Sequence, residues 1–252
     1  EIYMGDWSSD VCSSDLLAAL QGAHRLRILR RRSDDPAEAV SLMGLRFPNR
    51  LGLAAGFDKN GRYIDALGSL GFGFIEVGTV TPRPQAGQPR PRLFRLLPSS
   101  FHAPAAGALI NRMGFPNDGS SAIAARLAQR TFRGICGVNI GKNAATPLAE
   151  AIDDYVACYR AVAPYADYVA VNVSSPNTKD LRRLQQAEYL QPILESLIEQ
   201  REALRARQSR PIPLLIKISP DLSEDELRAV AQLLMQVAIW RSEERRVGKE
   251  CR

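Results

Sequence analysis

YVAVNVSSPNTK, residues 168–179, is an apolar run that ends abruptly in polar residues, and the same transition recurs along the chain. Four other apolar runs behave alike, at 51–55, 72–77, 135–140 and 214–218. They lead into AAGFDKNG, EVGTVTP, GVNIGKN and IKISPD. Helical periodicity fills the intervals at about 60–70, 118–130, 147–163, 186–207 and 224–239. Alternating strands and helices predict a parallel sheet with helices outside it.

The polar segments decide between two kinds of parallel sheet. In parallel α/β proteins the carboxyl ends of the strands open on one face, where ligands bind. Five consecutive polar ends favour a TIM barrel, because a doubly wound sheet needs such loops only at its switch point. A full barrel has eight strands. We therefore expect an incomplete (β/α)8 barrel with about five βα units, and a long proline-rich insertion at 79–118 that covers the site or forms a subdomain.

Composition excludes several classes of protein. The chain has 252 residues, of which 45% are hydrophobic and 24% charged, the balance of a soluble globular protein. It lacks the run of roughly 18 apolar residues that a spanning helix needs. His24 and His102 are isolated, and Cys136 and Cys158 have no ligand spacing, so we expect no metal site and two buried thiols.

The two ends differ from the body. Residues 1–16 and 241–252 lack apolar periodicity and resemble translated adapter sequence, so we treat them as non-native tails; the alternative is that they are true, poorly ordered termini. Removing them raises the net charge from +6 to +8, because together they carry −2. The basic character therefore belongs to the body. No aromatic-interleaved basic patch accompanies it, and we expect no nucleic-acid partner.

Residues 17–43 form a separate amino-terminal segment. LAALQGAHRLRILRRR, residues 17–32, reads as a basic amphipathic helix, which suits either a membrane surface or a solvated helix packed on its own domain. Asp35, Pro36 and Glu38 then predict the start of a second helix that Gly44 ends. The barrel is expected over residues 44–240.

Lysine usage points to particular positions. Only five of the 33 basic residues are lysine, and the four in the body all follow strands: Lys59, Lys142, Lys179 and Lys217. A lysine kept in an arginine-rich chain suggests a place that needs a compact ammonium. We favour a functional role for Lys59 and Lys217 and leave Lys142 and Lys179 open.

The strand-end loops also supply asparagines and a serine, namely Asn111, Asn139, Asn172, Ser175 and Asn177. Asparagine pairs a donor with an acceptor, which suits the amide edges of a heterocycle, and lysine suits a carboxylate or phosphate. These residue types predict a pocket for a planar, anionic, amide-containing ligand. Neither GxGxxG nor a Walker loop follows a strand.

Six segments in order resemble the dihydroorotate dehydrogenase family, specifically its quinone-dependent class 2. They are GLRFPNRLGLAAGFDKNG (44–61), IEVGTVTPRPQAGQPRPRLFRL (75–96), INRMGF (110–115), GVNIGKN (137–143), VNVSSPNTK (171–179) and LLIKISPDL (214–222). The resemblance covers nearly all of residues 20–240. It implies an FMN-containing TIM barrel that oxidises dihydroorotate to orotate in pyrimidine synthesis.

The resemblance assigns two groups of residues. FMN is expected to contact Ala55, Gly56, Phe57, Asp58, Lys59, Thr79, Asn139, Asn172 and Lys217. The substrate is expected to contact Lys59, Asn111, Arg112, Met113, Gly114, Phe115, Asn172 and Asn177. Ser175 is expected to be the base that takes the proton from C5 of dihydroorotate, with Thr178 as a member of its relay.

Class 2 membership further implies a quinone acceptor and a peripheral position on the cytoplasmic side of a bacterial inner membrane, with residues 17–43 at the bilayer. Two alternatives remain: a class 1 enzyme or related flavin reductase that uses fumarate or a nicotinamide, and a non-catalytic nucleotide-binding α/β scaffold. Because five strands cannot close a barrel, we expect this polypeptide alone to be inactive.

Overall fold

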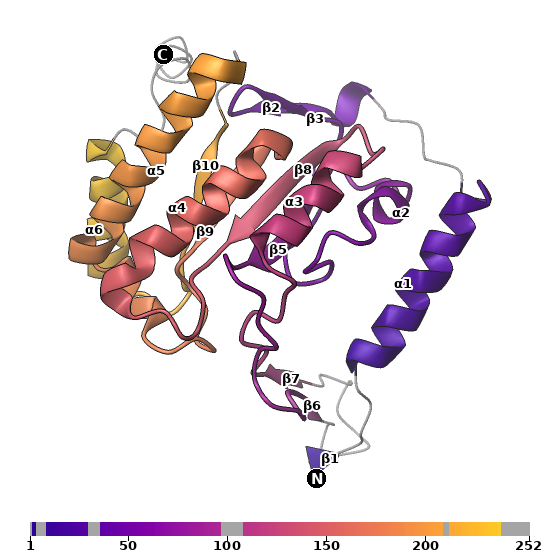
Figure 1. Ribbon diagram of the computed structural model, residues 1–252, viewed down its shortest axis with the longest axis horizontal. Helices are drawn as coiled ribbons and strands as arrows, with labels where there is room; N and C mark the ends of the chain where they lie inside the picture. The colour runs from indigo at the N-terminus through magenta and orange to yellow at the C-terminus, as the bar shows by residue number, and fades with distance from the viewer. Residues whose placement is uncertain (1, 4–8, 30–35, 97–107, 209–211, 238–252) are drawn as a thin grey trace.

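A computed structural model describes residues 2–3, 9–29, 36–96, 108–208 and 212–237 (Figure 1). Its centre is a five-stranded parallel sheet in the order β10-β9-β8-β5-β4. The strands are β4 (Gly52–Leu53), β5 (Phe74–Val80), β8 (Ile135–Ile140), β9 (Tyr168–Asn172) and β10 (Leu214–Lys217). The predicted parallel α/β fold is confirmed. The sheet is open, with β4 and β10 at its edges.

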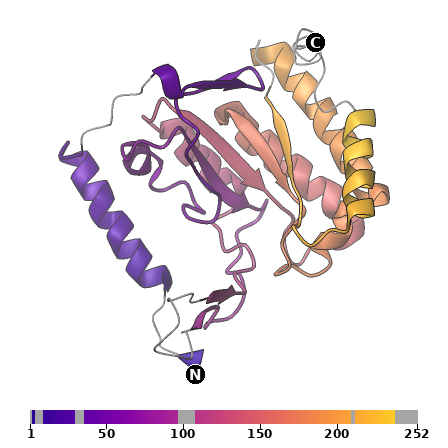
Figure 2. The ribbon, with the colours of Figure 1, turned by 180° about the vertical axis from the view of Figure 1, so that it is seen from behind.

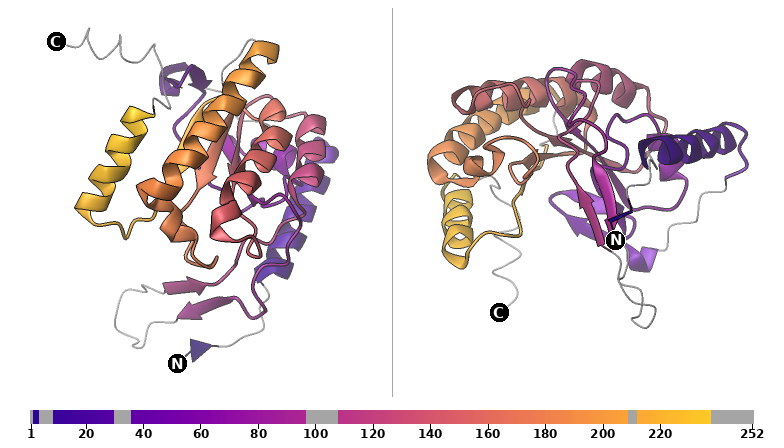
Figure 3. Two further views of the ribbon diagram at one scale, coloured as in Figure 1. Left: turned by 60° about the vertical axis from the view of Figure 1, so that its left-hand side comes forward. Right: turned by 90° about the horizontal axis from the view of Figure 1, so that it is seen from below.

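Helices follow the strands in the predicted alternation. They are α2 (Ile64–Gly68), α3 (Ser120–Gln129), α4 (Ala151–Val162), α5 (Ala187–Gln208) and α6 (Glu224–Gln236). Seen from below, helices lie outside a curved row of strands (Figure 3, right). Seen from behind, the opposite face of the sheet carries none of the helices α3 to α6 (Figure 2). The predicted capping box at the start of α6 is present, formed by Ser223 and Glu226.

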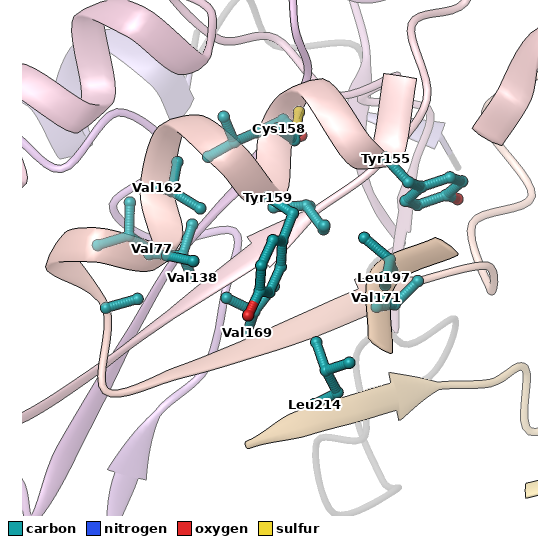
Figure 4. Packing of buried hydrophobic residues seen from close by; sticks show 14 of the residues in the cluster. Val77, Val138, Tyr155, Cys158, Tyr159, Val162, Val169, Val171, Leu197 and Leu214 are labelled. Atoms are coloured by element: carbon teal, nitrogen blue, oxygen red, sulfur yellow. Dashed lines mark hydrogen bonds between the residues drawn. The ribbon is translucent and has the colours of Figure 1, made fainter. Parts of the chain in front are cut away.

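The main core lies between the sheet and these helices. Successive side chains of a strand point to opposite faces, and on β5 the residues Ile75 and Val77 are fully buried on the helix side. Figure 4 shows Tyr159 of α4 among Val169 of β9 and Leu214 of β10. Cys136 and Cys158 are free, buried thiols, as predicted.

A second, smaller core lies on the inner face of the sheet, and a hairpin closes it. The hairpin consists of β2 (Val40–Leu42) and β3 (Leu45–Phe47), and Leu45 and Phe47 pack there with Tyr168 and Ala170. The ring of Tyr168 lies where a side chain at position 137 would stand, so only glycine fits at Gly137.

The expected helix ending at Gly44 is wrong. Pro36–Glu38 forms a single 3-10 turn, η1, and the chain then enters the hairpin. Met43 and Gly44 make up its two-residue loop, with φ of +55° and +72°. Positive φ at both positions is the signature of the hairpin turns that match strand twist, so Gly44 marks a turn between strands.

The amino-terminal helix is displaced from its expected position. α1 runs over Ser9–Arg25 and so begins inside the segment 1–16 that we set aside. Leu17 is buried in the main core, which ties α1 to the domain. Residues 1, 4–8 and 238–252 lie outside the described residues, and the assignment of both tails stays a prediction.

The long insertion forms a hairpin beside the carboxyl ends of the strands, where β6 (Leu93–Leu96) pairs with β7 (Ala108–Asn111) (Figure 1). β1 (Ile2–Tyr3) adds to β6 as a third strand. Residues 97–107 lie outside the described residues. The remaining 3-10 turns are η2 (Leu148–Glu150), η3 (Ala163–Tyr165) and η4 (Leu181–Gln185).

Candidate active site

Three polar side chains meet on the inner face of the sheet, at the carboxyl ends of adjacent strands. Thr79 Oγ1 donates to Asn139 Oδ1 at 2.6 Å. Asn172 Nδ2 donates to Thr79 Oγ1 and to Asn139 Oδ1, both at 3.1 Å. All three side chains are buried. The structure thus brings together three of the residues that the sequence predicted for the site.

The carboxylate of Glu76, which was not predicted from the sequence, holds the Asn139 amide in place. Glu76 Oε1 accepts from Asn139 Nδ2 at 2.9 Å, and Glu76 Oε2 accepts from Tyr168 Oη at 3.0 Å. Because Asn139 donates through Nδ2 here, its Oδ1 is left to accept from Thr79 and Asn172. Burial and the neighbouring Glu76 carboxylate raise the pKa of Tyr168, which keeps its hydroxyl a donor. The one signal in the sequence is an acid inside the apolar run FIEVGTV.

Asn172 also shapes the loop that follows β9. Its Oδ1 accepts from the backbone N of Ser174 at 3.0 Å and from Ser174 Oγ at 2.9 Å. Its backbone carbonyl accepts from Tyr155 Oη of α4 at 2.8 Å. The side-chain amide is therefore held from both ends, which sets the direction in which the chain leaves the strand toward Ser175.

The Ser175 loop contacts the β6–β7 hairpin. Ser175 is half-buried, and its Oγ accepts from the backbone N of Asn177 at 3.2 Å. Asn177 Nδ2 donates to Asn111 Oδ1 at 3.2 Å, and Gln88 Nε2 donates to the Asn177 carbonyl at 3.1 Å. Two predicted substrate residues, 66 positions apart in sequence, are thus hydrogen-bonded beside the predicted base.

Residues 111–115 form a turn that returns the hairpin toward the strand ends. Gly114 and Phe115 have positive φ of +68° and +52°. A side chain added at Gly141, just past β8, would stand 3.1 Å from the Phe115 ring and 2.8 Å from Thr79 Cγ2. Phe115 therefore lies against the end of the Thr79 and Asn139 strands.

The other two predicted residues of this turn point to structural contacts in the described chain. The Arg112 guanidinium donates to the Pro91 carbonyl at 2.9 Å and lies over the Phe94 ring. The Met113 carbonyl accepts from the backbone N of Gln88 at 3.0 Å.

The loop after β4 carries the next group of predicted residues. Gly56 has φ of +103°, and its N–H donates to the Gly78 carbonyl at 2.8 Å. An added side chain at Gly56 would meet no atom within 4 Å. Lys59 Nζ donates to the Gly56 carbonyl at 2.5 Å. Ala55 is half-buried and Phe57 is exposed, so the backbone of this loop is open at Gly56.

Asp58 has a structural task within that loop. Its Oδ1 and Oδ2 accept from the backbone N–H groups of Arg62 and Tyr63 at 3.0 and 2.8 Å. Burial raises the pKa of the Asp58 carboxyl, while these backbone hydrogen bonds oppose the rise. The side chain thus holds the turn before α2, and only its backbone remains for a ligand.

The lysines separate into two kinds. Lys217 is exposed at the end of β10 and pairs in register with Asn172 of β9, so it adjoins the polar group. Lys142 is buried and donates to the carbonyls of Asn143 and Thr146 at 2.9 and 2.6 Å. Burial lowers the pKa of Lys142. Through these two hydrogen bonds Lys142 stabilises the loop after β8. Lys179, by contrast, is exposed.

Comparison with known proteins decides the family. The family model described as dihydroorotate dehydrogenase matches residues 38–240. The chain belongs to the dihydroorotate dehydrogenase family. It is 51% identical over 218 residues to the dihydroorotate dehydrogenase (quinone) of Nitrosospira multiformis, covering 86% of this chain and 60% of that protein. It is 50% identical over 233 residues to the protein of the same name from Pseudomonas aeruginosa, covering 92% of this chain and 65% of that protein.

Solved structures of this family share the fold. The enzyme of Eimeria tenella in complex with ferulenol aligns with a TM-score of 0.77 at 33% identity, over 91% of this chain and 64% of that one. Its ligand-free form aligns with a TM-score of 0.75 at 35% identity, over 88% of this chain and 66% of that one. The chain therefore spans a little under two thirds of the relatives it matches, and the fold is of the TIM-barrel type without closure.

Proposed function

We propose that this chain is the part of a quinone-dependent dihydroorotate dehydrogenase that carries the FMN contacts and the catalytic base. The observation that carries this proposal is the hydrogen-bonded group of Thr79, Asn139 and Asn172 at three adjacent strand ends, next to the Ser175 loop. The family and the names of its relatives support dihydroorotate as the substrate and quinone as the electron acceptor.

The residues present fit a flavin. Asn139 Nδ2 keeps a second hydrogen after its bond to Glu76, and Lys217 adds an ammonium, so donors are available for the oxygen-rich edge of a flat heterocycle. The backbone of residues 55–59 supports the ring, where Gly56 permits close approach. FMN, when bound, accepts the hydride from C6 of dihydroorotate. Asn139, Thr79 and Lys217 bind and orient it.

Two asparagines that are hydrogen-bonded to each other, Asn111 and Asn177, bind the substrate in this proposal. Asn111 and Asn177, with Asn172, present amide groups to the amide edges of the dihydroorotate ring. Lys59 offers an ammonium for the substrate carboxylate. The turn of residues 111–115 places Phe115 against the strand ends, where it excludes water from this side.

Ser175 takes the proton from C5. A serine hydroxyl is a weak base and needs a route for the proton it receives. Thr178 follows on the same loop, and its buried Oγ1 has no hydrogen-bond partner within the described part of the chain. Buried hydroxyls are ordinarily paired. The orphaned Thr178 hydroxyl therefore supports its place in a relay from Ser175.

Residues 17–43 supply the membrane and quinone side of the proposal, on the cytoplasmic face of the bacterial inner membrane. Leu26 and Ile28, just past α1, are 73% and 67% exposed. Such large apolar side chains beside arginines are typical of segments that lie on a bilayer. Within the described ranges, no helix combines the length and apolarity needed to cross a membrane.

This polypeptide alone neither holds FMN tightly nor turns over dihydroorotate, because its sheet is open at β4 and β10 and leaves part of a closed site unbuilt. The check is the flavin absorbance spectrum of the purified 252-residue chain. A stoichiometric flavin band would overturn this part of the proposal.

The test of the activity uses a chimera in which residues 17–237 are joined to the remaining carboxyl-terminal part of the Pseudomonas aeruginosa relative. We expect quinone-dependent oxidation of dihydroorotate, and a loss of about 10²- to 10⁴-fold in flavin reduction by dihydroorotate in Ser175→Ala, with orotate binding retained. Ser41→Ala, at an exposed serine of β2, is the matched control.

Two outcomes would contradict the proposal. Reduction of fumarate in place of quinone would indicate a class 1 type of enzyme. Indifference of flavin reduction to Ser175→Ala would indicate a scaffold that binds without catalysing.

A further inference from the structure

The turn of residues 111–115 contains two consecutive residues in the left-handed region of backbone conformation. Gly114 has φ of +68°, and Phe115 has φ of +52°. Glycine adopts such angles at little cost, whereas a residue as bulky as phenylalanine is strained there. Strain of this kind persists only where the surrounding structure holds it, and it gathers at ligand sites. The conformation of Phe115 therefore needs contacts from outside the turn.

Two side-chain amides hold the carbonyls of these two residues. Asn117 Nδ2 donates to the Phe115 carbonyl at 2.9 Å, and Gln85 Nε2 donates to the Gly114 carbonyl at 3.0 Å. Asn117 and Gln85 also face each other, and the backbone N of each donates to the carbonyl of the other at 3.0 Å. The two residues form a pair, which we call the amide clamp, on consecutive carbonyls of the turn.

Polar groups just past the ends of β5 and β8 fix the amide clamp. Asn117 Oδ1 accepts from the backbone N of Thr81 at 3.2 Å, and Asn117 Nδ2 donates to Thr81 Oγ1 at 2.8 Å. Gln85 Oε1 accepts from Asn143 Nδ2 at 2.8 Å and from the backbone N of Ala144 at 3.0 Å. Asn143 Nδ2 also donates to Thr81 Oγ1 at 3.0 Å, so one hydroxyl links both halves. Because these bonds occupy the amide oxygens, the amide nitrogens face the turn.

The clamp determines where the Phe115 ring lies. Phe115 is half-buried, and its ring lies beside Gly141, two residues past Asn139 of the polar group. A side chain leaves the backbone in a direction that φ sets, so a turn that relaxed out of the left-handed region would carry the ring away from the strand ends. Thr81, Asn117 and Asn143 are buried, which makes the loss of any of these hydrogen bonds costly.

We propose that Asn117 and Gln85 are positioning residues for substrate binding, which hold Phe115 in its left-handed conformation and so keep its ring against the substrate. Both act through the turn, and Sequence analysis assigned neither of them. This inference rests on the proposed function and deepens it, because it names the residues that shape the substrate side of the same site.

The experiment replaces each amide of the clamp by the acid of the same size. Asn117→Asp and Gln85→Glu keep an acceptor oxygen but place a second oxygen where the turn carbonyl needs a donor. In the chimera we expect each variant to raise the KM for dihydroorotate about tenfold, the equivalent of about 1.4 kcal/mol. The limiting rate of flavin reduction is expected to change by less than about threefold. A variant that was merely destabilised would lose bound FMN and rate, with KM unchanged.

Asn49→Asp is the matched control. Asn49 is half-buried before β4, donates from Nδ2 to the Gly71 carbonyl at 3.0 Å and accepts from the backbone N of Leu51 at 3.0 Å. It thus holds backbone in the same way at the amino end of a strand, away from the site, and its replacement should leave KM unchanged.

A second background tests whether Asn117 acts through Phe115. Phe115→Gly removes both the ring and the cost of positive φ, so the clamp has nothing left to position. We expect Asn117→Asp to raise KM less than about twofold further in this background. A further rise as large as in the parent chimera would show that Asn117 binds substrate directly and would overturn the positioning role.

Hydrogen exchange of the 252-residue chain tests the clamp without FMN or substrate. We expect peptides that cover residues 111–117 to exchange faster in Asn117→Asp than in the parent, and peptides that cover β8 to stay unchanged. Unchanged exchange over residues 111–117 would overturn the clamp. Faster exchange with unchanged KM would overturn its role toward substrate, and the proposed function would stand if Ser175→Ala still stopped flavin reduction. A parent chimera that does not oxidise dihydroorotate would overturn the proposed function and the substrate role together. An equal rise of KM in Asn49→Asp would show a general effect of buried charge and would overturn the inference alone.

Discussion

The two faces of the central sheet bury side chains of opposite character. On β5 the helix-side residues Ile75 and Val77 are apolar and fully buried, whereas Glu76 between them faces inward and joins Tyr168 and Asn139. β8 and β9 follow the same alternation, with Val138 and Val171 on the helix side. One face therefore holds the apolar core, and the other holds a hydrogen-bonded group of polar side chains.

Neighbouring positions of one strand give the largest expected contrast. Ile75→Ala removes a fully buried side chain from the helix side, and we expect it to lower the free energy of unfolding by about 3 kcal/mol. Urea denaturation of the chain measures this loss. Glu76→Gln is the matched comparison on the inner face and is expected to cost less. An equal loss of unfolding free energy in both variants would contradict this, because it would show that the two faces contribute equally to stability.

Glu76→Gln is expected to lower the free energy of unfolding by about 2 kcal/mol, because hydrogen bonds to a charged group are worth more than neutral ones. It should also weaken FMN binding in the chimera, since the neutral Gln side chain offers one acceptor oxygen in place of two and holds the Asn139 amide less firmly. Tyr168→Phe removes only one of the two bonds and should have the smaller effect on FMN. Unchanged FMN affinity in Glu76→Gln would contradict the positioning role of Glu76.

We expect the core on the helix side of the sheet to lose stability first as the pH rises. Burial raises the pKa of the Cys136 thiol from 9.0 to about 12, so the folded protein holds the proton more tightly than the unfolded chain does. Stability from this group is complete below about pH 9 and is lost as the pH rises toward 12, by about 1.4 kcal/mol for each unit in between. Urea midpoints measured from pH 7 to 10.5 test this.

Cys136→Ala should flatten the alkaline loss in part, because burial also raises the pKa values of Cys158 and Tyr155 on the same side. A midpoint that stays level to pH 10.5 in the parent chain would contradict the prediction.

Sequence patterns predicted the sheet and the strand-end loops because both depend on local regularities. Apolar runs of five or six residues followed by Gly, Asn and Ser mark where strands end, and the structure places those ends together. The hairpin of β2 and β3 was missed because Pro36 and Glu38 do start a helical turn, which then lasts only three residues. Positive φ at Met43 depends on strand pairing, which no single position reveals.

The residues of the candidate site were predictable from the sequence, whereas the hydrogen bonds between them were less so. Asn139 and Asn172 stood out as polar groups at strand ends, whereas Thr79 was assigned only through the resemblance to the family. The bonds of Glu76 to Asn139 and Tyr168 cross 63 and 92 positions of sequence, so a single chain gives no sign of them. The Asp58 carboxylate accepts hydrogen bonds from the backbone amides of Arg62 and Tyr63 and so stabilises a local turn. Turns of this kind also occur in many non-catalytic loops.

The smallest expected effect on stability concerns the contact between the hairpin and the Ser175 loop. The Asn111–Asn177 bond is 3.2 Å long and exposed, so Asn177→Ala should lower the free energy of unfolding by only about 0.5 kcal/mol. The same change should raise the KM of the chimera for dihydroorotate, because it removes an amide that faces the substrate and one of the two bonds between the loop and the hairpin segment. A double-mutant cycle with Asn111→Ala separates these two causes. If the two losses in kcat/KM multiply, each asparagine binds substrate independently; if the second change adds little, the bond between them is what positions the loop. Stability loss without any change in KM would place both residues outside the substrate site.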